Sequence, residues 1–258
     1  MNKNIELKLK NGFRNTNCFI PLTEISEKIK KKDFKVIEDE SFLGFIKKTE
    51  YDFSYLYFYI QNKLDFKLDV LKSKRKIIVE IIFSNRRKES WNPILEKFYI
   101  FGFDKYTSFN RMIYIKQTNK TLNYKNNQVI GLREDDLNLV KKFLEKNFDI
   151  YAEKIPTLQE LRNLSKTTYL IKINNEIAAL LISDKNGFTE ELRYWLVDKK
   201  YRGEGFGGIL MKYFLNNFSD TKTYLLWVQE NNQNAIEKYQ YFGFKKDKLS
   251  MYILKNKN

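Results

Sequence analysis

The sequence contains no histidine, a single cysteine and only three prolines among its 258 residues. Imidazole is the base of Ser-His-Asp and Cys-His sites and a frequent metal ligand, so its lack excludes those catalytic classes and His-ligated metal centres. We therefore expect a site without metal. Cys18 cannot form an intrachain disulfide by itself and is predicted to be a small buried hydrophobe in a reducing compartment.

Long apolar runs are also missing. No stretch of 18 apolar residues occurs, and the opening segment MNKNIELKLKNGF lacks the apolar core of a signal peptide. We therefore expect a cytoplasmic protein without a membrane span. The residues that are present are 43% hydrophobic and 16% aromatic. A chain of this length and composition can bury a large core, in one large domain or two of ordinary size.

Positive charge dominates the chain. Lysine and arginine number 47 against 32 acidic residues, giving a net charge of +15, which favours anionic partners such as phosphates. The excess lies mainly in the first half: residues 1–127 carry 26 basic and 15 acidic side chains, whereas residues 128–258 carry 21 and 17. Basic clusters at 28–32, 72–76 and 86–88 are read as solvated faces, with an acidic substrate or nucleic acid as the alternative.

The order of predicted elements indicates an α+β fold. The polar segment 116–127 is a candidate linker between a domain at 1–120 and another at 128–258. After it, apolar periodicity predicts a strand, two helices and a three-stranded meander, then a glycine-rich loop, a helix, a strand, a helix and a final strand. Their expected positions are 129–132, 135–148, after Pro156, 168–173, 176–183, 191–197, 208–218, 223–229, 235–242 and 251–254.

The two halves are similar to each other. ILEKFYIFGF at 94–103 aligns with AIEKYQYFGF at 235–244, and five of the ten positions are identical. The neighbouring strands correspond as well, because KIIVEIIF stands where TYLLWVQE stands. We interpret this as a decayed duplication. The first copy lacks the glycine-rich loop and the helix after it.

That loop, in the segment KKYRGEGFGGIL, is the strongest functional signal. Gly203, Gly205, Gly207 and Gly208 let the backbone approach a ligand, and backbone N–H groups at a helix start suit a pyrophosphate. A β-carbon at Gly205 or Gly207 is expected to collide with it, and Arg202 adds a positive charge. The spacing also fits a dinucleotide-binding turn, but too few residues follow for that fold. A nucleoside triphosphate loop fails because no Gly-Lys-Ser/Thr follows.

Here the chain resembles the GNAT superfamily of acyl-CoA-dependent N-acyltransferases. RGEGFG at 202–207 fits the family's Arg/Gln-x-x-Gly-x-Gly/Ala loop, and Asn232-x-x-Ala235 with Tyr239-x-x-x-Gly243-Phe244 fits its second motif. The resemblance spans roughly residues 128–258. It implies a mixed sheet that opens between ELRYWLV and TYLLWVQ, with the pantetheine arm of acetyl-CoA in the gap. The implied cofactor-binding residues are Val197, Arg202, Gly203, Gly205, Phe206, Gly207, Gly208 and Asn232.

The resemblance also implies catalytic roles. Tyr239 would be the general acid that protonates the leaving thiolate, with a core aromatic as the alternative. Glu191 would be the general base, unless it is only solvated or paired with Arg193. Strand alternation predicts that Glu191, Arg193 and Trp195 share one face, while Glu190, Leu192 and Tyr194 share the other.

The first half departs from the family pattern. Phe98 stands where Tyr239 stands and the loop is absent, so we expect a degenerate GNAT-like copy that neither binds CoA nor catalyses. The sequence as a whole predicts an N-acetyltransferase that uses acetyl-CoA and a small-molecule or peptide amine. Nucleic acid is not favoured as a partner, and the oligomeric state stays open. Alternatives are a non-catalytic CoA-binding module and aminoacyl transfer from charged tRNA.

Overall fold

The computed structural model describes residues 5, 15–62, 65–68, 75–116, 126–217 and 220–257. Contacts between residues divide the chain into two compact units, one formed by 1–109 with 248–258 and one by 110–247. These limits differ from the domains expected at 1–120 and 128–258, and most of the expected linker lies outside the described residues. They differ because two long strands, β6 (Phe103–Ile115) and β12 (Lys245–Asn256), contribute to both units.

The first unit is built on a mixed sheet with the strand order β2-β3-β4-β5-β12. Strands β4 and β5 are parallel, whereas β2 with β3, β3 with β4 and β5 with β12 pair antiparallel. A buried aromatic cluster with Phe58, Phe66 and Phe98 joins the sheet to α3. The elements are β1 (Asn15–Thr16), α2 (Leu22–Lys30), β2 (Phe34–Glu38), β3 (Phe42–Lys48), β4 (Phe53–Ile60), β5 (Lys76–Ser84), η2 (Asn85–Trp91) and α3 (Asn92–Ile100).

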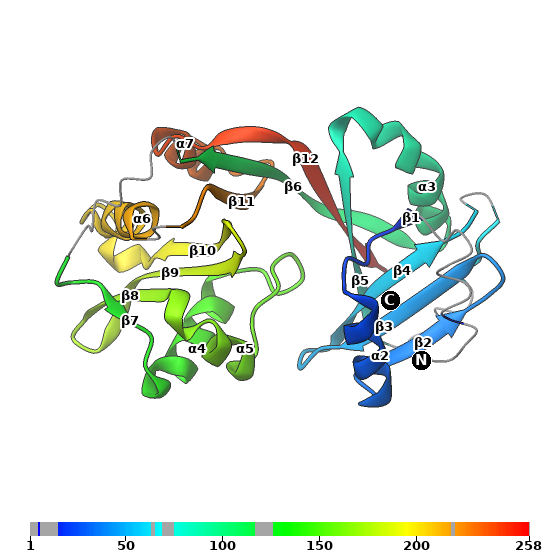
Figure 1. Cartoon of the computed structure of the whole chain (residues 1–258), viewed down its shortest axis with the longest axis horizontal. Helices are drawn as coiled ribbons and strands as arrows, with labels where there is room; N and C mark the ends of the chain where they lie inside the picture. The colour runs from blue at the N-terminus through cyan, green and yellow to red at the C-terminus, as the bar shows by residue number, and fades with distance from the viewer. Residues whose placement is uncertain are drawn as a thin grey trace. The chain divides into compact units, whose positions relative to one another are not determined.

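The second unit contains the strand order β6-β11-β10-β9-β8-β7, with α6 against one face of the sheet and α4 and α5 on the other (Figure 1). The expected meander is present, and Asn174 and Asn175 form its first turn with φ of 50° and 64°. The elements are β7 (Ile130–Gly131), η3 (Glu134–Asp136), α4 (Leu137–Asn147), α5 (Leu158–Asn163), η4 (Ser165–Thr167), β8 (Thr168–Ile173), β9 (Glu176–Asn186), β10 (Thr189–Val197), η5 (Lys199–Tyr201), α6 (Phe206–Asn216), β11 (Thr223–Gln229) and α7 (Gln233–Tyr241).

The two repeats exchange their last strands. β6 follows α3 in the chain, yet its second half, from Asn110 onward, lies in the second unit, where β6 is the neighbour of β11. β12 follows α7, yet its residues Leu249–Lys255 pair with Ser84–Ile78 of β5 in the first unit. Each copy therefore completes its sheet with a strand from the other copy.

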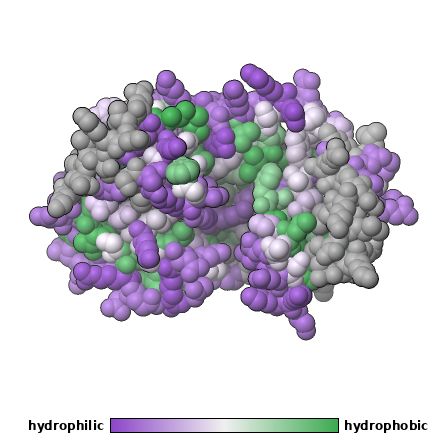
Figure 2. Space-filling view, in the orientation of Figure 1, coloured by the Kyte–Doolittle hydropathy of each residue, from purple (hydrophilic) through white to green (hydrophobic). Residues whose placement is uncertain are grey.

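The surface agrees with the charged composition. On the face seen in Figure 2 most described residues are hydrophilic, and smaller groups of hydrophobic residues lie among them. Within the described ranges, none of the helices is long and apolar enough to cross a membrane.

Candidate active site

The glycine-rich loop connects β10 to α6 through the short helix η5. Asp198 begins η5 by accepting a hydrogen bond from the Lys200 backbone N–H at 2.9 Å. Gly203 and Gly205 then adopt φ of 96° and 78°, a left-handed conformation that favours glycine. Gly205 is the N-cap of α6, so the first N–H groups of that helix have no partner within it and remain available to an anion.

A cavity of about 610 Å³ lies beside this loop, within the second unit. All eight residues predicted to bind the cofactor line it, and so does Tyr239. The structure therefore brings the two sequence motifs together at one site. Its lining residues are Trp195, Leu196, Val197, Tyr201, Arg202, Gly203, Gly205, Phe206, Gly207, Gly208, Asn232, Asn234, Ala235, Lys238, Tyr239 and Phe242.

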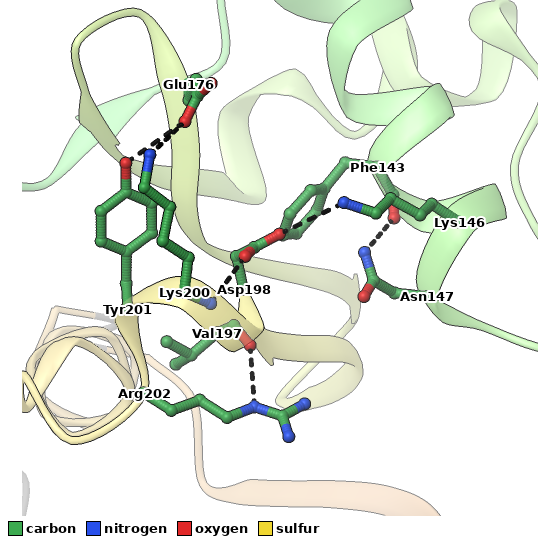
Figure 3. A network of polar contacts seen from close by, with 9 residues as sticks. All are labelled: Phe143, Lys146, Asn147, Glu176, Val197, Asp198, Lys200, Tyr201 and Arg202. Atoms are coloured by element: carbon green, nitrogen blue, oxygen red, sulfur yellow. Dashed lines mark hydrogen bonds and ion pairs between the residues drawn. The ribbon is translucent and has the colours of Figure 1, made fainter.

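The charges around the loop leave one arginine available to an anion. Figure 3 shows Glu176 bound by Lys200 (3.1 Å) and Tyr201, and Asp198 within 3.8 Å of Lys146. The hydrogen bond from Lys200 holds the pKa of the exposed Glu176 carboxyl below its usual value. In the part of the chain that the structure describes, the Arg202 side chain bonds only the Val197 carbonyl oxygen, at 3.5 Å. Its charge is thus not neutralised by a carboxylate.

The glycines of the loop have different roles. A β-carbon on Gly207 would meet the Trp195 ring and a Val197 methyl at 3.2 Å each, and Trp195 Nε1 donates to the Gly207 carbonyl at 3.0 Å. Gly207 therefore allows α6 to approach β10. The expectation that its β-carbon would collide with a pyrophosphate is wrong for Gly207, because that direction is filled by the protein. A β-carbon on Gly208 would meet no atom of the described residues within 4 Å.

Tyr239 lies on α7 with 9% of its surface exposed. Its ring packs against Trp195 and Phe244, with centroids 5.4 and 6.0 Å away. Burial raises the pKa of the phenol, so the hydroxyl keeps its proton. Among the described residues no hydrogen-bond partner holds this hydroxyl, and the residue lines the cavity. Tyr239 can therefore donate a proton to a ligand there.

Asn232 begins α7. Its Oδ1 accepts a hydrogen bond from the Ala235 N–H at 3.1 Å, as an N-cap side chain does. This bond explains the Asn-x-x-Ala spacing as a capping motif. The amide also lines the cavity, next to Asn234 and Lys238.

Strands β10 and β11 separate beside this cavity. Their parallel pairing runs from Thr189 with Thr223 to Leu192 with Leu226, and the rest of β10 lines the cavity through Trp195, Leu196 and Val197. This is the opening that the sequence predicts between the two strands.

The acetyltransferase (GNAT) family model matches residues 135–244. The chain carries a GNAT domain. Its loop, its cavity and the opening of its sheet all lie inside or beside the matched segment. No curated protein matches the chain.

Solved GNAT structures resemble most of the chain. A GCN5-related N-acetyltransferase from Sphaerobacter thermophilus has a TM-score of 0.56 at 11% identity, covering 84% of this chain and 76% of its own. One from Kribbella flavida has 0.54 at 10%, covering 93% and 97%. A tandem GNAT protein from the clavulanic acid biosynthesis pathway has 0.54 at 9%, covering 85% and 80%. These likenesses concern the fold, and they confirm the tandem α+β architecture.

Glu191 does not line the cavity of about 610 Å³ that contains Tyr239. Glu191 lines another hollow, of about 510 Å³, with Asp184, Lys185, Asn186, Thr189 and Leu225. It lies one position before the last pair of β10 with β11, so it is next to the point where the strands separate.

The predicted alternation of β10 is wrong beyond Leu192. A β-bulge between Leu192 and Tyr194 shifts the register against β9. As a result Leu192 and Trp195 both join the core cluster that contains α6 residues. The Tyr194 hydroxyl instead bonds the Lys154 carbonyl oxygen, and the Tyr194 ring packs on Phe148. A bulge adds one residue to a strand and so reverses the faces after it.

Glu190 cannot serve as the base. It is fully buried, and Ser183 Oγ donates to its Oε1 at 2.6 Å. Burial raises the pKa of this carboxyl, and its other oxygen finds no hydrogen-bond partner within the described part of the chain. Glu190 is therefore enclosed by the protein, whereas a base must be accessible to the amine.

Sequence reasoning missed Glu153. This residue lies in the irregular segment between α4 and α5. Burial is the main cause of the raised pKa of Tyr239 and of Tyr194, and the Glu153 charge adds to both. Its carboxylate therefore acts electrostatically on the catalytic candidate. Neither periodicity nor a motif marks it, so the sequence alone held no signal.

Proposed function

We propose that this protein transfers an acetyl group from acetyl-CoA to a primary amine. One observation carries the proposal: a single cavity joins a helix N-terminus, an arginine that has no carboxylate partner among the described residues, and a buried tyrosine hydroxyl. The first two suit a pyrophosphate, and the third suits a leaving thiolate.

The residues of the cavity fit CoA. Gly205 and Gly208 expose the start of α6, and Arg202 adds positive charge for the phosphates. The part of β10 after Leu192 offers an edge for an extended arm with amide groups. When bound, acetyl-CoA supplies the acetyl group as a reactive thioester.

Two side chains would move protons. Tyr239 holds its proton on the phenolic oxygen because burial disfavours the phenolate, and it would donate that proton to the departing sulfur. Glu191 would accept a proton from the incoming ammonium. Since Glu191 lines a neighbouring hollow, the transfer would run through a water or follow the approach of the amine from that side.

The β-bulge adds a third group. The residue it inserts between Leu192 and Tyr194 stands outside the regular ladder with β9. In this proposal, a backbone N–H of the bulge would donate to the carbonyl oxygen as negative charge develops there. The bulge lies next to the opening between β10 and β11, where the thioester would end.

The test is acetyl-CoA turnover with small amines, amino sugars, polyamines and peptide N-termini as acceptors. Turnover is measured by the release of the free thiol of CoA. We expect acetylation of at least one class, and no thiol release beyond the background without an acceptor. Calorimetric binding of CoA without turnover by any acceptor would instead support the non-catalytic CoA-binding module.

A further inference from the structure

The first unit contains a counterpart of the opening in the GNAT domain. Its parallel strands β4 and β5 pair from Phe53 with Lys76 to Tyr55 with Ile78. By the internal repeat, β4 and β5 correspond to β10 and β11, whose pairing also ends after a few residues. Beyond Tyr55 and Ile78 the first unit therefore has the same kind of slot between two diverging strands.

This slot is bridged by the side chain of Asn17. Its Nδ2 donates to the carbonyl oxygens of Leu56 on β4 and Glu80 on β5, at 2.9 Å each. Its Oδ1 accepts from the Phe58 N–H at 2.6 Å. With 8% of its surface exposed, Asn17 is part of the interior. One buried amide thus satisfies backbone groups on both sides of the slot.

The residues around Asn17 extend this contact along β4. β1 pairs antiparallel with β4, through Thr16 with Tyr59 and Asn15 with Ile60. Thr16 Oγ1 also donates to the Phe58 carbonyl oxygen at 2.6 Å. The backbone edge of β4 is therefore covered by a strand from the same chain.

The GNAT domain differs at the corresponding place. There the end of β10 lines the cavity of about 610 Å³. The two copies thus have corresponding slots. The slot of the first unit is filled by protein, whereas the slot of the second unit is an open cavity.

We propose that residues 15–18 are the built-in occupant of the first slot, in the position where the second slot takes the extended arm of acyl-CoA. This rests on the proposed function of the second slot. A ligand joined through the chain competes at a high effective concentration, so a free ligand cannot displace it easily. The first copy is then closed by its own N-terminal segment as well as by the lack of the loop.

Hydrogen exchange of the full chain with and without CoA tests this. We expect residues 54–60 and 78–82 to be protected already without CoA and to remain unchanged when CoA is added. Residues 193–208 should become protected by CoA. If CoA increases the protection of 54–60, the inference is overturned. If CoA changes the protection of neither 54–60 nor 193–208, the result contradicts the proposed function instead.

Variants then test the occupant directly. Asn17→Ala should speed exchange at 56–60 by roughly tenfold or more, since the Phe58 N–H loses its acceptor. Thr16→Val is the milder variant if Asn17→Ala fails to fold, and should act in the same direction. Asn62→Ala is the control, because its amide is exposed and bonds Asp65. Exchange at 56–60 equal to the control in both variants would overturn the inference, whatever CoA does.

Discussion

Gly208→Ala is expected to make the protein more stable and to weaken its binding of CoA. Gly208 is the third residue of α6 and its φ is not in the left-handed region. Among the residues that the structure describes, none has an atom within 4 Å of a β-carbon built there. Alanine therefore fits without strain. Replacing glycine by alanine inside a helix is worth roughly 0.5–1 kcal/mol. For a unit of this size we expect an increase in Tm of about 2–4 °C at the upper value.

The loss of binding has a separate cause. Gly208 lines the cavity at the start of α6, so the added methyl group would occupy space proposed for the phosphates. We expect the Kd for CoA to rise about tenfold, which corresponds to about 1.4 kcal/mol. Stability and affinity would then change in opposite directions, which a general defect in folding cannot produce.

Thermal unfolding and calorimetric titration with CoA measure the two effects. Gly131→Ala is the matched control, because its β-carbon also meets nothing within 4 Å and the residue does not line the cavity. Gly207→Ala should instead lower stability through contact with Trp195 and Val197. Unchanged CoA affinity in a stable Gly208→Ala protein would show that the phosphates do not lie against α6.

Tyr239→Phe should lower kcat by roughly 10²- to 10⁴-fold with little change in CoA affinity, and a loss below about threefold would restrict Tyr239 to packing. Because burial raises the pKa of Tyr239 above its ordinary value of 10, the phenol of the wild-type protein should still be protonated at pH 10. A pH profile of kcat checks this, since kcat should not fall there through loss of the acid. Glu191→Gln should lower turnover near neutral pH and recover in part at higher pH, where more of the amine is neutral; an equal loss at every pH would favour positioning. Glu190→Gln should raise Tm at pH 7–8 but not at pH 4. The pKa of Glu190 is raised in the folded state, so the stability that its protonation gives is fully present below the unfolded pKa of 4.5 and is lost as the pH rises through the folded pKa. Equal Tm differences at both pH values would contradict this reading of Glu190.

Local chemistry made the glycine-rich loop predictable. Left-handed glycines at 203 and 205 and the Asn232 cap each depend on a few neighbouring residues, so they leave a pattern in the sequence. The same holds for the meander and its Asn174-Asn175 turn. These features need no knowledge of distant contacts.

The missed features depend on contacts between distant segments. The bulge after Leu192 is set by pairing with β9, and no residue type marks it. It reversed the expected faces of Tyr194 and Trp195. Gly207 fits the ligand motif by spacing, yet its surroundings come from β10. Glu153 lies in an irregular segment, and the electrostatic effect of its charge on Tyr239 depends on the fold and not on a local motif.

The exchange of last strands sets an order for folding during synthesis. The first unit needs Leu249–Lys255 to pair with β5, so β5 lacks this neighbour until translation reaches the end of the chain. In the second unit, in contrast, β6 is synthesised before the other strands of its sheet. The later repeat can therefore complete its sheet first. A gene fragment that begins at residue 128 would lack β6 and leave one edge of β11 uncovered. The two repeats therefore cannot be separated at the boundary that the sequence predicts.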